Sequence, residues 1–143
     1  MHWILQGNSS RFDLRRYVQQ PSIYWFVNRY LDDMQLADHV FIWESGPKGG
    51  VVAYGHINEL PVMRSQVAHP HVLADELWRD QVPDPQSFVV GITVVASVHT
   101  GFFVPRDIVR AQSDLATLDL FKMPQGTVFR CTGQQVVTML GLT

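Results

Sequence analysis

Two apolar runs separated by a glycine-rich turn dominate the pattern in the middle of the chain. Residues 40–43 are Val-Phe-Ile-Trp, and residues 51–57 form a second apolar run that contains Gly55. β-branched and aromatic residues favour strands, and the intervening residues 45–50 hold the proline and glycines that favour a turn. The pattern therefore predicts a β-hairpin, with a bulge or a close backbone approach at Gly55.

Shorter periodic segments on both sides of the hairpin predict further strands and small helices. Apolar runs predict strands over residues 2–6, 22–27 and 87–97, and the last is so apolar that it is expected inside the sheet. Helical spacing predicts helices or single turns over 11–19, 72–78, 106–111 and 115–121. A terminal helix is predicted from Thr132, with Val136, Val137 and Leu140 on its apolar face. Strands dominate, so the predicted class is α+β with a mixed, strongly curved sheet that could close into a barrel.

Composition and charge are those of one globular domain spanning residues 1–143. Hydrophobic residues make up 46% of the chain and charged residues 17%. The formal net charge of −2 argues against binding nucleic acid mainly through charge, although local arginines can still contact phosphates. The N-terminus lacks a signal-peptide pattern and no apolar stretch reaches membrane-spanning length. We therefore expect a cytoplasmic protein with no membrane partner.

Motifs for catalysis, disulfide formation and metal binding are missing from the sequence. It contains no phosphate-binding Gly-Lys-Ser/Thr loop and no Gly-x-Ser-x-Gly nucleophile elbow. Cys131 is the only cysteine and is expected to be buried and inert, while Asp38 is expected to form a turn. His69 and His71 have no partner at a zinc-binding spacing. We therefore expect no catalytic residue, no metal and no cofactor.

An ordered set of short motifs runs through nearly the whole chain. Trp-Ile-Leu-Gln-Gly-Asn at residues 3–8 is a strand that opens into a polar turn. Ala-Asp-His-Val-Phe-Ile-Trp-Glu-Ser-Gly at residues 37–46 is a strand that ends in an aromatic, a small polar residue and glycine. Val-Ala-Tyr-Gly-His-Ile at 52–57, Pro-Gln-Gly-Thr-Val-Phe at 124–129 and Thr132 complete the set. In this order the motifs resemble the EVE domain of the PUA-like superfamily, a relative of the YTH and ASCH domains.

The resemblance departs from the family at one position. The family usually has glycine before the aspartate that opens the hairpin strand, and this chain has Ala37 before Asp38. Alanine is sterically unfavourable at positive φ, where glycine is not. We therefore expect a looser turn or a slightly displaced Asp38, with more effect on the detail of the fold than on the pocket.

The resemblance implies a fold and a binding site. The fold is PUA-like, a curved mixed β-sheet or β-barrel with short helices around it. The site is an aromatic-lined pocket that accepts a modified base flipped out of DNA or RNA, or a modified nucleoside. Trp25 matches the first aromatic wall of this pocket, and Trp43 matches the aromatic at the following strand end. The other implied base-binding positions are Gln6, Gly7, Asn8, Ser9, Asn28, Ser45, Gly46, Gln125 and Thr127.

Each of these residues also has a purely structural interpretation. Trp25 and Trp43 could be core residues, as Trp3 and Trp78 are expected to be. Polar residues in the first turn could serve only as loop formers and helix caps. The candidates for phosphate contact form a basic set that could equally be a solvated surface, and they are Arg11, Arg15 and Arg29.

The sequence predicts a module that recognises a modified nucleobase in an aromatic-lined pocket. One alternative is a small ASCH-type hydrolase or metabolite-binding protein. Such a hydrolase is expected to place Lys, Glu or Asp in the cleft, where this chain has Asn, Ser, Trp and Gln. A third hypothesis is a protein-interaction adaptor that uses an apolar surface around Phe102 and Phe103. DNA and RNA partners, the kind of modification and the oligomeric state stay open at this point.

Overall fold

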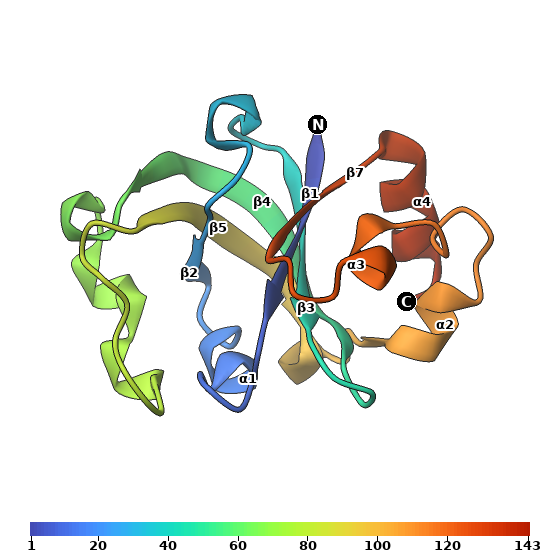
Figure 1. Ribbon diagram of the computed structural model, residues 1–143, viewed down its shortest axis with the longest axis horizontal. Coiled ribbons are helices and arrows are strands. Elements are labelled where there is room, and N and C mark those ends of the chain that lie inside the picture. Colours follow the sequence, from blue (N-terminus) through green and yellow to red (C-terminus); the bar gives the residue numbers. More distant parts are fainter.

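A mixed sheet of seven strands organises the chain, which the computed structural model describes from Met1 to Thr143 (Figure 1). The hydrogen-bonded order is β2-β5-β4-β3-β1-β7, and β6 pairs with the start of β4. Only β1 and β3 pair in parallel, and the other pairs are antiparallel. The strands are β1 His2–Gly7, β2 Ser22–Phe26, β3 His39–Glu44, β4 Gly50–Met63, β5 Phe88–Ser97, β6 Val104–Pro105 and β7 Val128–Cys131.

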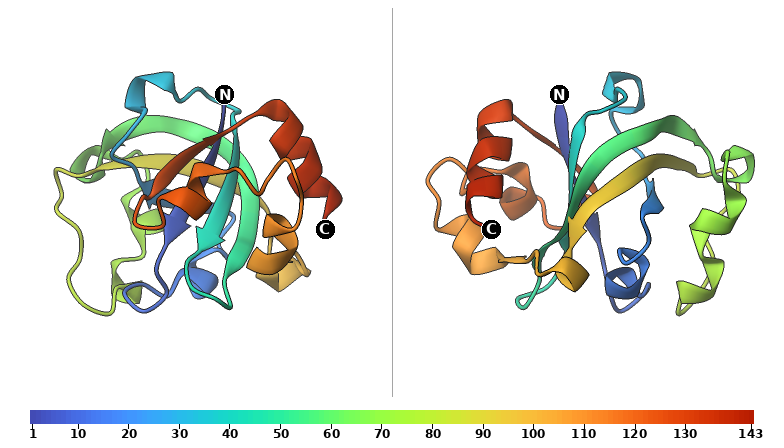
Figure 2. Two further views of the ribbon diagram at one scale, coloured as in Figure 1. Left: turned by 45° about the vertical axis from the view of Figure 1, so that its right-hand side comes forward. Right: turned by 180° about the vertical axis from the view of Figure 1, so that it is seen from behind.

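Short helices connect the strands, and three of the four α-helices lie on one side of the sheet. The α-helices are α1 Leu14–Tyr17, α2 Arg106–Arg110, α3 Asp119–Lys122 and α4 Gly133–Gly141. The 3₁₀ turns are Leu31–Asp33, Arg64–Gln66, Pro70–Leu73, Asp75–Leu77 and Val98–Thr100. Figure 2 shows α2, α3 and α4 gathered on the side of the sheet opposite to the segment that follows β4. None of the helices has the length and the apolar character that crossing a membrane requires.

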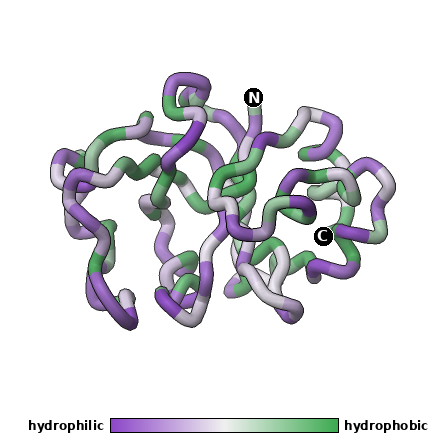
Figure 3. The backbone as a smooth tube through the Cα atoms, in the orientation of Figure 1, coloured by the Kyte–Doolittle hydropathy of each residue, from purple (hydrophilic) through white to green (hydrophobic).

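Strand alternation divides the core into two main clusters on the two faces of the sheet. On β1, Trp3 and Leu5 pack in the first cluster with Trp25, whereas Ile4 packs in the second cluster with Phe41. The second cluster is closed by buried side chains of α2, α3 and α4. Figure 3 shows the hydrophobic stretches concentrated along the strands and the hydrophilic ones in the peripheral turns. The first cluster is the one that borders the candidate site.

The long strand β4 carries the chain from the centre of the sheet to its border. It reaches Met63, well beyond the predicted end at residue 57, and its pairing with β5 shifts register at three places. One shift lies at Gly55, where an added Cβ would collide with the carbonyl oxygen of Thr93, so the predicted close approach is confirmed. β4 can contain Pro61 because its pairing with β3 ends at His56, which leaves one edge of the strand free of ladder hydrogen bonds.

The predicted elements are present with altered boundaries. The helix predicted over 11–19 is reduced to α1, and the strand predicted over 87–97 is β5, which has a neighbour on each edge. On α4, Val136 is buried as predicted, but Val137 is 64% exposed and Met139 is buried instead. Residues one position apart on a helix differ by about 100°, so 136, 139 and 140 share a face and 137 does not. The apolar face predicted for the terminal helix is therefore corrected at Val137.

The sheet curves strongly, its ladder stays open between the edge strands β2 and β7, and the curvature brings β2 near the end of β1. The strands β1 and β2 are not hydrogen-bonded neighbours in the sheet order. A side chain joins them instead, because Nε1 of Trp25 on β2 donates to the carbonyl oxygen of Gln6 on β1 at 3.4 Å. The border between the two strands is therefore lined by side chains rather than by a continuous ladder.

Candidate functional site

A cavity of about 510 Å³ lies at the border between β1 and β2. Its walls are the end of β1 with the turn after it, the strand β2, and the segment 64–87 that connects β4 to β5, here called the covering segment. The covering segment is the yellow-green part of the chain that lies apart from the terminal helices in Figure 1. Cavities of this size are typical of sites for small molecules and single ligand groups.

Aromatic side chains from three separate elements form the apolar walls. Trp25 comes from β2, Phe12 from the turn before α1, and Trp78 from the covering segment. The ring of Phe12 lies 4.6 Å from Trp78 between centroids, and it meets Trp25 edge-on at 6.5 Å and 86°. A bridge between the backbones of Phe12 and Trp78 holds the two walls together. The arrangement presents aromatic surface to any flat molecule in the cavity.

Trp25 reaches the cavity because Gly7 leaves room for its ring. On β2, alternation puts Trp25 on the same face as Ile23 and Val27, and all three belong to the first core cluster. A Cβ on Gly7 would lie only 2.6 Å from Cζ2 of Trp25. Trp25 is 7% exposed, so it is at once a core residue and a wall of the cavity. The structure therefore confirms the core interpretation of Trp25 and places its ring at the cavity, and its role in base binding stays a prediction.

Polar side chains near the cavity form hydrogen bonds that connect the segments around it. Nε2 of Gln6 donates to the carbonyl oxygens of Pro124 and Gly126 at 2.8 and 2.6 Å, which ties β1 to the segment before β7. Oγ1 of Thr127 donates to Oδ1 of Asn28 at 3.3 Å. Oδ1 of Asn8 accepts from the backbone N–H and the hydroxyl of Ser10, at 2.9 and 2.7 Å, and so closes the turn after β1.

The cavity brings together only part of the set of residues that the sequence proposed. Gln6, Gly7, Asn8, Arg11, Trp25 and Thr127 line it. Others do not line it, and these are Ser9, Arg15, Asn28, Arg29, Trp43, Ser45, Gly46 and Gln125. Two of these residues, Ser45 and Asn28, are hydrogen-bonded to residues that line the cavity. The N–H of Ser45 donates to the carbonyl oxygen of Gly7 at 2.9 Å, and Oδ1 of Asn28 accepts from Oγ1 of Thr127. Gly46 is an exposed residue of the hairpin turn with φ of 104°, which explains a glycine there.

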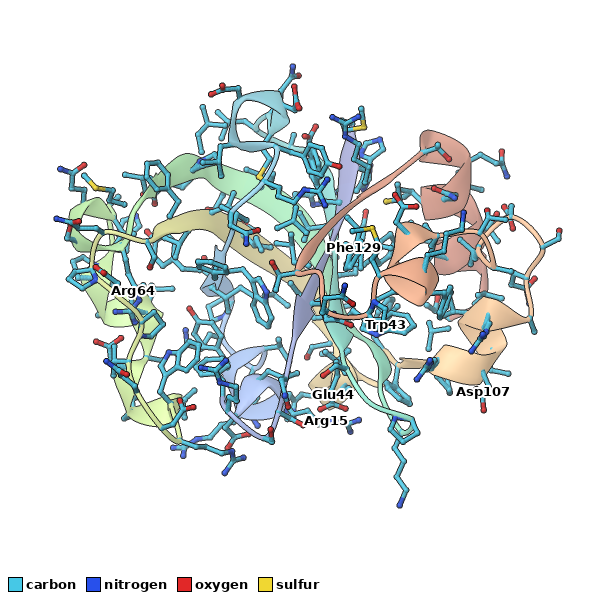
Figure 4. All side chains as sticks on the ribbon, viewed as in Figure 1. Arg15, Trp43, Glu44, Arg64, Asp107 and Phe129 are labelled. Carbon is cyan, nitrogen blue, oxygen red and sulfur yellow. The ribbon has the colours of Figure 1, made fainter.

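Trp43 lies outside the cavity, which corrects the position expected for it. Its side chain is 2% exposed in the second core cluster and meets Phe121 edge-on at 5.8 Å between ring centroids. Successive strand residues point to opposite faces, so Trp43 shares the face of Phe41, while Ile42 points to the first cluster. Figure 4 shows Trp43 close to Phe129, on the side of the sheet that carries α3.

The three arginines proposed for phosphate contact differ in how they are held. Nε and Nη2 of Arg15 donate to the buried carboxylate of Glu44 at 2.8–3.2 Å, and this hydrogen bonding raises the pKa of the Arg15 guanidinium (Figure 4). Arg29 lies over the ring of Tyr30, 4.7 Å from its centroid, and remains exposed. Arg11 lines the cavity and is paired with Asp80 at 3.1 Å. Arg15 is thus a structural ion pair, whereas Arg11 and Arg29 stay available at the surface.

Sequence reasoning missed several residues of the cavity because they come from the covering segment. Trp78 was expected to be structural only, and Arg64 was not singled out, yet both line the cavity. Phe12 and Tyr17 line it from the region of α1. No local pattern reveals these positions, because the covering segment reaches the cavity only through long-range contacts such as the backbone bond from the N–H of Asp13 to the carbonyl oxygen of Leu77.

Burial raises the pKa of the two tyrosines in the cavity wall. Burial, followed by a hydrogen bond to Glu59, raises the pKa of Tyr24 to about 12. Burial also raises the pKa of Tyr17, so both phenols keep their protons in neutral water. Outside the cavity, burial raises the pKa of the Cys131 thiol to about 12, so it is not a thiolate near neutrality. No group of three or more His, Cys, Asp or Glu side chains is arranged to hold a metal ion.

The chain combines a mixed curved sheet, small helices and an aromatic cavity at the border of the sheet. No protein-family profile matches the sequence, and no curated protein matches it either. Solved structures do match. A Pseudomonas putida protein covers 99% of this chain and 99% of its own, at 18% identity and a TM-score of 0.69.

Two human structures have the same fold. The DUF55 domain of human thymocyte nuclear protein 1 matches at 16% identity with a TM-score of 0.68, over 99% of this chain and 98% of that one. The human THYN1 protein in complex with DNA containing 5-methylcytosine matches at 16% identity with a TM-score of 0.69, over 99% and 96%. The PUA-like fold expected from the resemblance to EVE domains is therefore confirmed.

Proposed function

We propose that this protein binds a modified base, flipped out of DNA or RNA, in the cavity between β1, β2 and the covering segment. The observation that carries this proposal is the set of aromatic walls, Trp25, Phe12 and Trp78, around a cavity open to ligand. The human THYN1 structure in complex with 5-methylcytosine DNA supports it, because that protein shares the fold over nearly the whole chain.

The apolar walls provide a physical reason for preferring a modified base. A base leaves its stack at a cost of a few kcal/mol, which stacking on aromatic rings and edge hydrogen bonds must offset. Contact with an aromatic side chain contributes roughly 1–3 kcal/mol per base. A methyl group that becomes buried against Phe12, Trp25 or Trp78 adds about 0.8 kcal/mol, so methylation shifts the balance towards binding.

The polar border supplies the remaining contacts in this proposal. Gly7 and Asn8 place backbone and amide groups beside the ring of Trp25. Thr127 lies across the cavity from the covering segment and is held by Asn28. Arg11 and Arg29 are exposed, and they serve as contacts for the flanking phosphates.

Replacing Trp78 tests the function without removing a fully buried residue. Trp78 is half-buried and lines the cavity, so Trp78→Ala should weaken binding to an oligonucleotide with a single 5-methylcytosine at least fivefold while the protein stays folded. Fluorescence anisotropy measures the affinity, and circular dichroism checks the fold.

Trp43→Phe is the matched control, because it changes a tryptophan in the second core cluster. It should lower the melting temperature and leave the affinity unchanged. If Trp78→Ala binds as well as the wild type, or Trp43→Phe loses binding while still folded, the base is not in this cavity.

A further inference from the structure

Arg64 is a buried arginine in the wall of the cavity. It stands at the start of the covering segment and is 8% exposed (Figure 4). Its backbone N–H donates to the carbonyl oxygen of Ser87 at 2.8 Å, which joins the two ends of the covering segment. Arginine is almost never fully buried unless it is paired, so the groups that its guanidinium meets decide what it does.

Other groups of the protein use only part of the hydrogen-bonding capacity of this guanidinium. Nη2 of Arg64 donates to Oδ1 of Asp75, and this is the one side-chain hydrogen bond that Arg64 makes. No side-chain nitrogen or oxygen of the chain is both fully buried and unpaired. The remaining N–H donors of Arg64 therefore touch accessible space, and Arg64 is one of the residues that line the cavity.

The two tyrosine hydroxyls in the same cavity wall as Arg64 are already used in hydrogen bonds within the protein. The hydroxyl of Tyr17 donates to the carbonyl oxygen of Val72 at 2.8 Å and accepts from the N–H of Tyr24 at 2.7 Å. The hydroxyl of Tyr24 donates to Glu59 at 2.5 Å and accepts from the N–H of His69. Both phenols are already occupied, so the N–H donors left for a ligand at this wall are those of Arg64, together with the side-chain N–H groups of Trp78 and Gln81.

The charge of Arg64 is compensated, which decides the kind of acceptor it suits. Asp75 forms an ion pair with the guanidinium, so the pair as a whole is neutral. Because the pair carries no net charge, it attracts an anion only weakly, and the remaining N–H donors of Arg64 are suited to hydrogen-bond a neutral base. The planar guanidinium holds its N–H donors in a fixed fork that matches two adjacent acceptor atoms.

We propose that Arg64 selects bases that present two adjacent acceptors, which are O2 and N3 of cytosine or O6 and N7 of guanine. Adenine has an amino group beside N1 and N7, so one donor of Arg64 would face another donor. This inference rests on the proposed function, because it assigns the base class that enters the same cavity.

Binding measurements on three oligonucleotides test the inference. Each carries one central modified base in the same sequence: 5-methylcytosine, N2-methylguanine or N6-methyladenine. The wild-type protein should bind the cytosine or the guanine ligand at least about tenfold more tightly than the adenine ligand. The ligand that binds more tightly shows which pair of acceptors Arg64 contacts, O2 and N3 of cytosine or O6 and N7 of guanine. Deleting one acceptor, as 3-deaza-5-methylcytosine or 7-deaza-N2-methylguanine, should remove most of that preference in the wild type.

Two variants connect the preference to Arg64. Arg64→Lys keeps a positive charge beside Asp75 but loses the planar fork, so the preference should fall to about threefold or less. Arg11→Lys is the matched control on the cavity border, and it should weaken all three ligands alike while keeping their ratio. Circular dichroism checks that both variants fold. If Arg64→Lys does not fold, the deaza ligands on the wild-type protein test the role of Arg64.

The possible results separate the two proposals. Equal or tighter binding of the N6-methyladenine ligand overturns the role of Arg64 and leaves the proposed function standing. An equal loss for all three ligands in Arg64→Lys, with no effect of the deaza substitutions, also overturns it, since Arg64 would then contact a phosphate or support the fold. A wild-type protein that binds none of the three ligands overturns the proposed function and this inference with it.

Discussion

At the scale of single residues, the contact between Gly7 and Trp25 shapes the cavity. The indole ring occupies the space where a side chain of residue 7 would lie, and its Nε1 donates to the carbonyl oxygen of Gln6. This contact joins β1 to β2, where the sheet has no ladder. The same ring is therefore part of the first core cluster and of the cavity wall, so its position should affect stability and, under the proposed function, binding.

Replacing Gly7 by alanine should displace that ring. The new Cβ would lie 2.6 Å from Cζ2 of Trp25 and 3.3 Å from Cδ2 of Leu14, so the indole must move. Overpacking of this kind costs about 1–3 kcal/mol of the free energy of unfolding, and we expect weaker binding of the modified base as well. Denaturant unfolding measures the first effect and anisotropy the second.

Gly133→Ala is the control for this substitution, because a Cβ there would have no neighbour within 4 Å and the residue lies in α4. It should be neutral or stabilising. A Gly7→Ala protein as stable as the wild type would show that the ring of Trp25 is not held as described.

At the scale of elements, the turn before β3 carries the departure from the family pattern. Ala37 has φ of 71°, in the left-handed region that alanine disfavours. Asp38 nevertheless occupies a well-bonded position, since its Oδ2 accepts from Nε1 of Trp3 at 2.9 Å and from the N–H of Gln35 at 3.0 Å. The turn is therefore strained at Ala37, and Asp38 ties it to the first core cluster.

Ala37→Gly should relieve that strain. A left-handed alanine costs roughly 1–2 kcal/mol, part of which is returned as the larger chain entropy of glycine, so we expect a gain of up to about 1 kcal/mol in the free energy of unfolding. Denaturant unfolding measures it. Ala111→Gly, at the end of α2 with φ of −73°, should have the opposite sign, because no strain is relieved there. Loss of stability in Ala37→Gly would contradict the strained turn.

At the scale of the whole molecule, a cluster of histidines links three strands on the face of the second core cluster. His2 on β1 and His39 on β3 lie 4.7 Å apart between ring centroids, and His39 and His56 on β4 lie 4.9 Å apart. Nδ1 of His39 is hydrogen-bonded to the hydroxyl of Tyr54 at 2.5 Å. Burial lowers the pKa of both His2 and His39, the N-terminal ammonium adds to the effect at His2, and the other two histidines add to it at His39.

These lowered pKa values make the stability of the protein fall at mildly acid pH. The unfolded chain binds protons at its histidines near pH 6.5, while the folded protein resists protonation at His2 and His39, so acid favours unfolding. The contribution of the cluster is complete above about pH 6.5 and is lost as the pH falls below it. Urea unfolding at intervals between about pH 5 and 8 measures the dependence.

His39→Asn should reduce that dependence, and replacement of the exposed His71 by Gln should not. The His39→Asn substitution keeps the sheet pairing, since the ladder between β3 and β4 uses backbone groups. A stability that stays constant from pH 7 to pH 5 in the wild type would contradict the lowered pKa values.

The distribution of charge over the whole molecule predicts how binding responds to salt. Two exposed arginines have acidic partners: Arg11 pairs with Asp80 and Arg130 with Asp33. Together with the net charge of −2, this leaves room for only about two to four phosphate contacts. The slope of log affinity against log salt concentration should therefore lie between about −1.4 and −3.6.

Anisotropy titrations at several salt concentrations measure this slope. Arg29→Gln should make it shallower by about 1, whereas Arg110→Gln, on α2, should leave it unchanged. A much steeper slope would require an extended basic surface, for example one built by association of two chains.

Much of the architecture follows from the sequence alone. The hairpin over residues 40–57, the strand β5 and the helix after Thr132 follow from local patterns, because alternation, turn residues and a capping box act over a few residues. The extension of β4 from residue 57 to Met63 was not predicted. The ordered motifs also led to the PUA-like fold and to Trp25 as a wall of the cavity. The sequence placed Gln6, Gly7, Asn8 and Thr127 near one another only through the resemblance, and the fold brings them to one cavity.

Only the tertiary structure decided the rest of the site. The face to which Trp43 points depends on the register of β3 within the whole sheet, and a shift of one residue would have turned it to the other face. Trp78 and Arg64 reach the cavity because the bend of β4 carries the covering segment back over β2, and pairings between distant residues hold it there. Local patterns determine which segments become strands and turns, whereas the choice of neighbours across the chain depends on the free energy of the complete packed molecule.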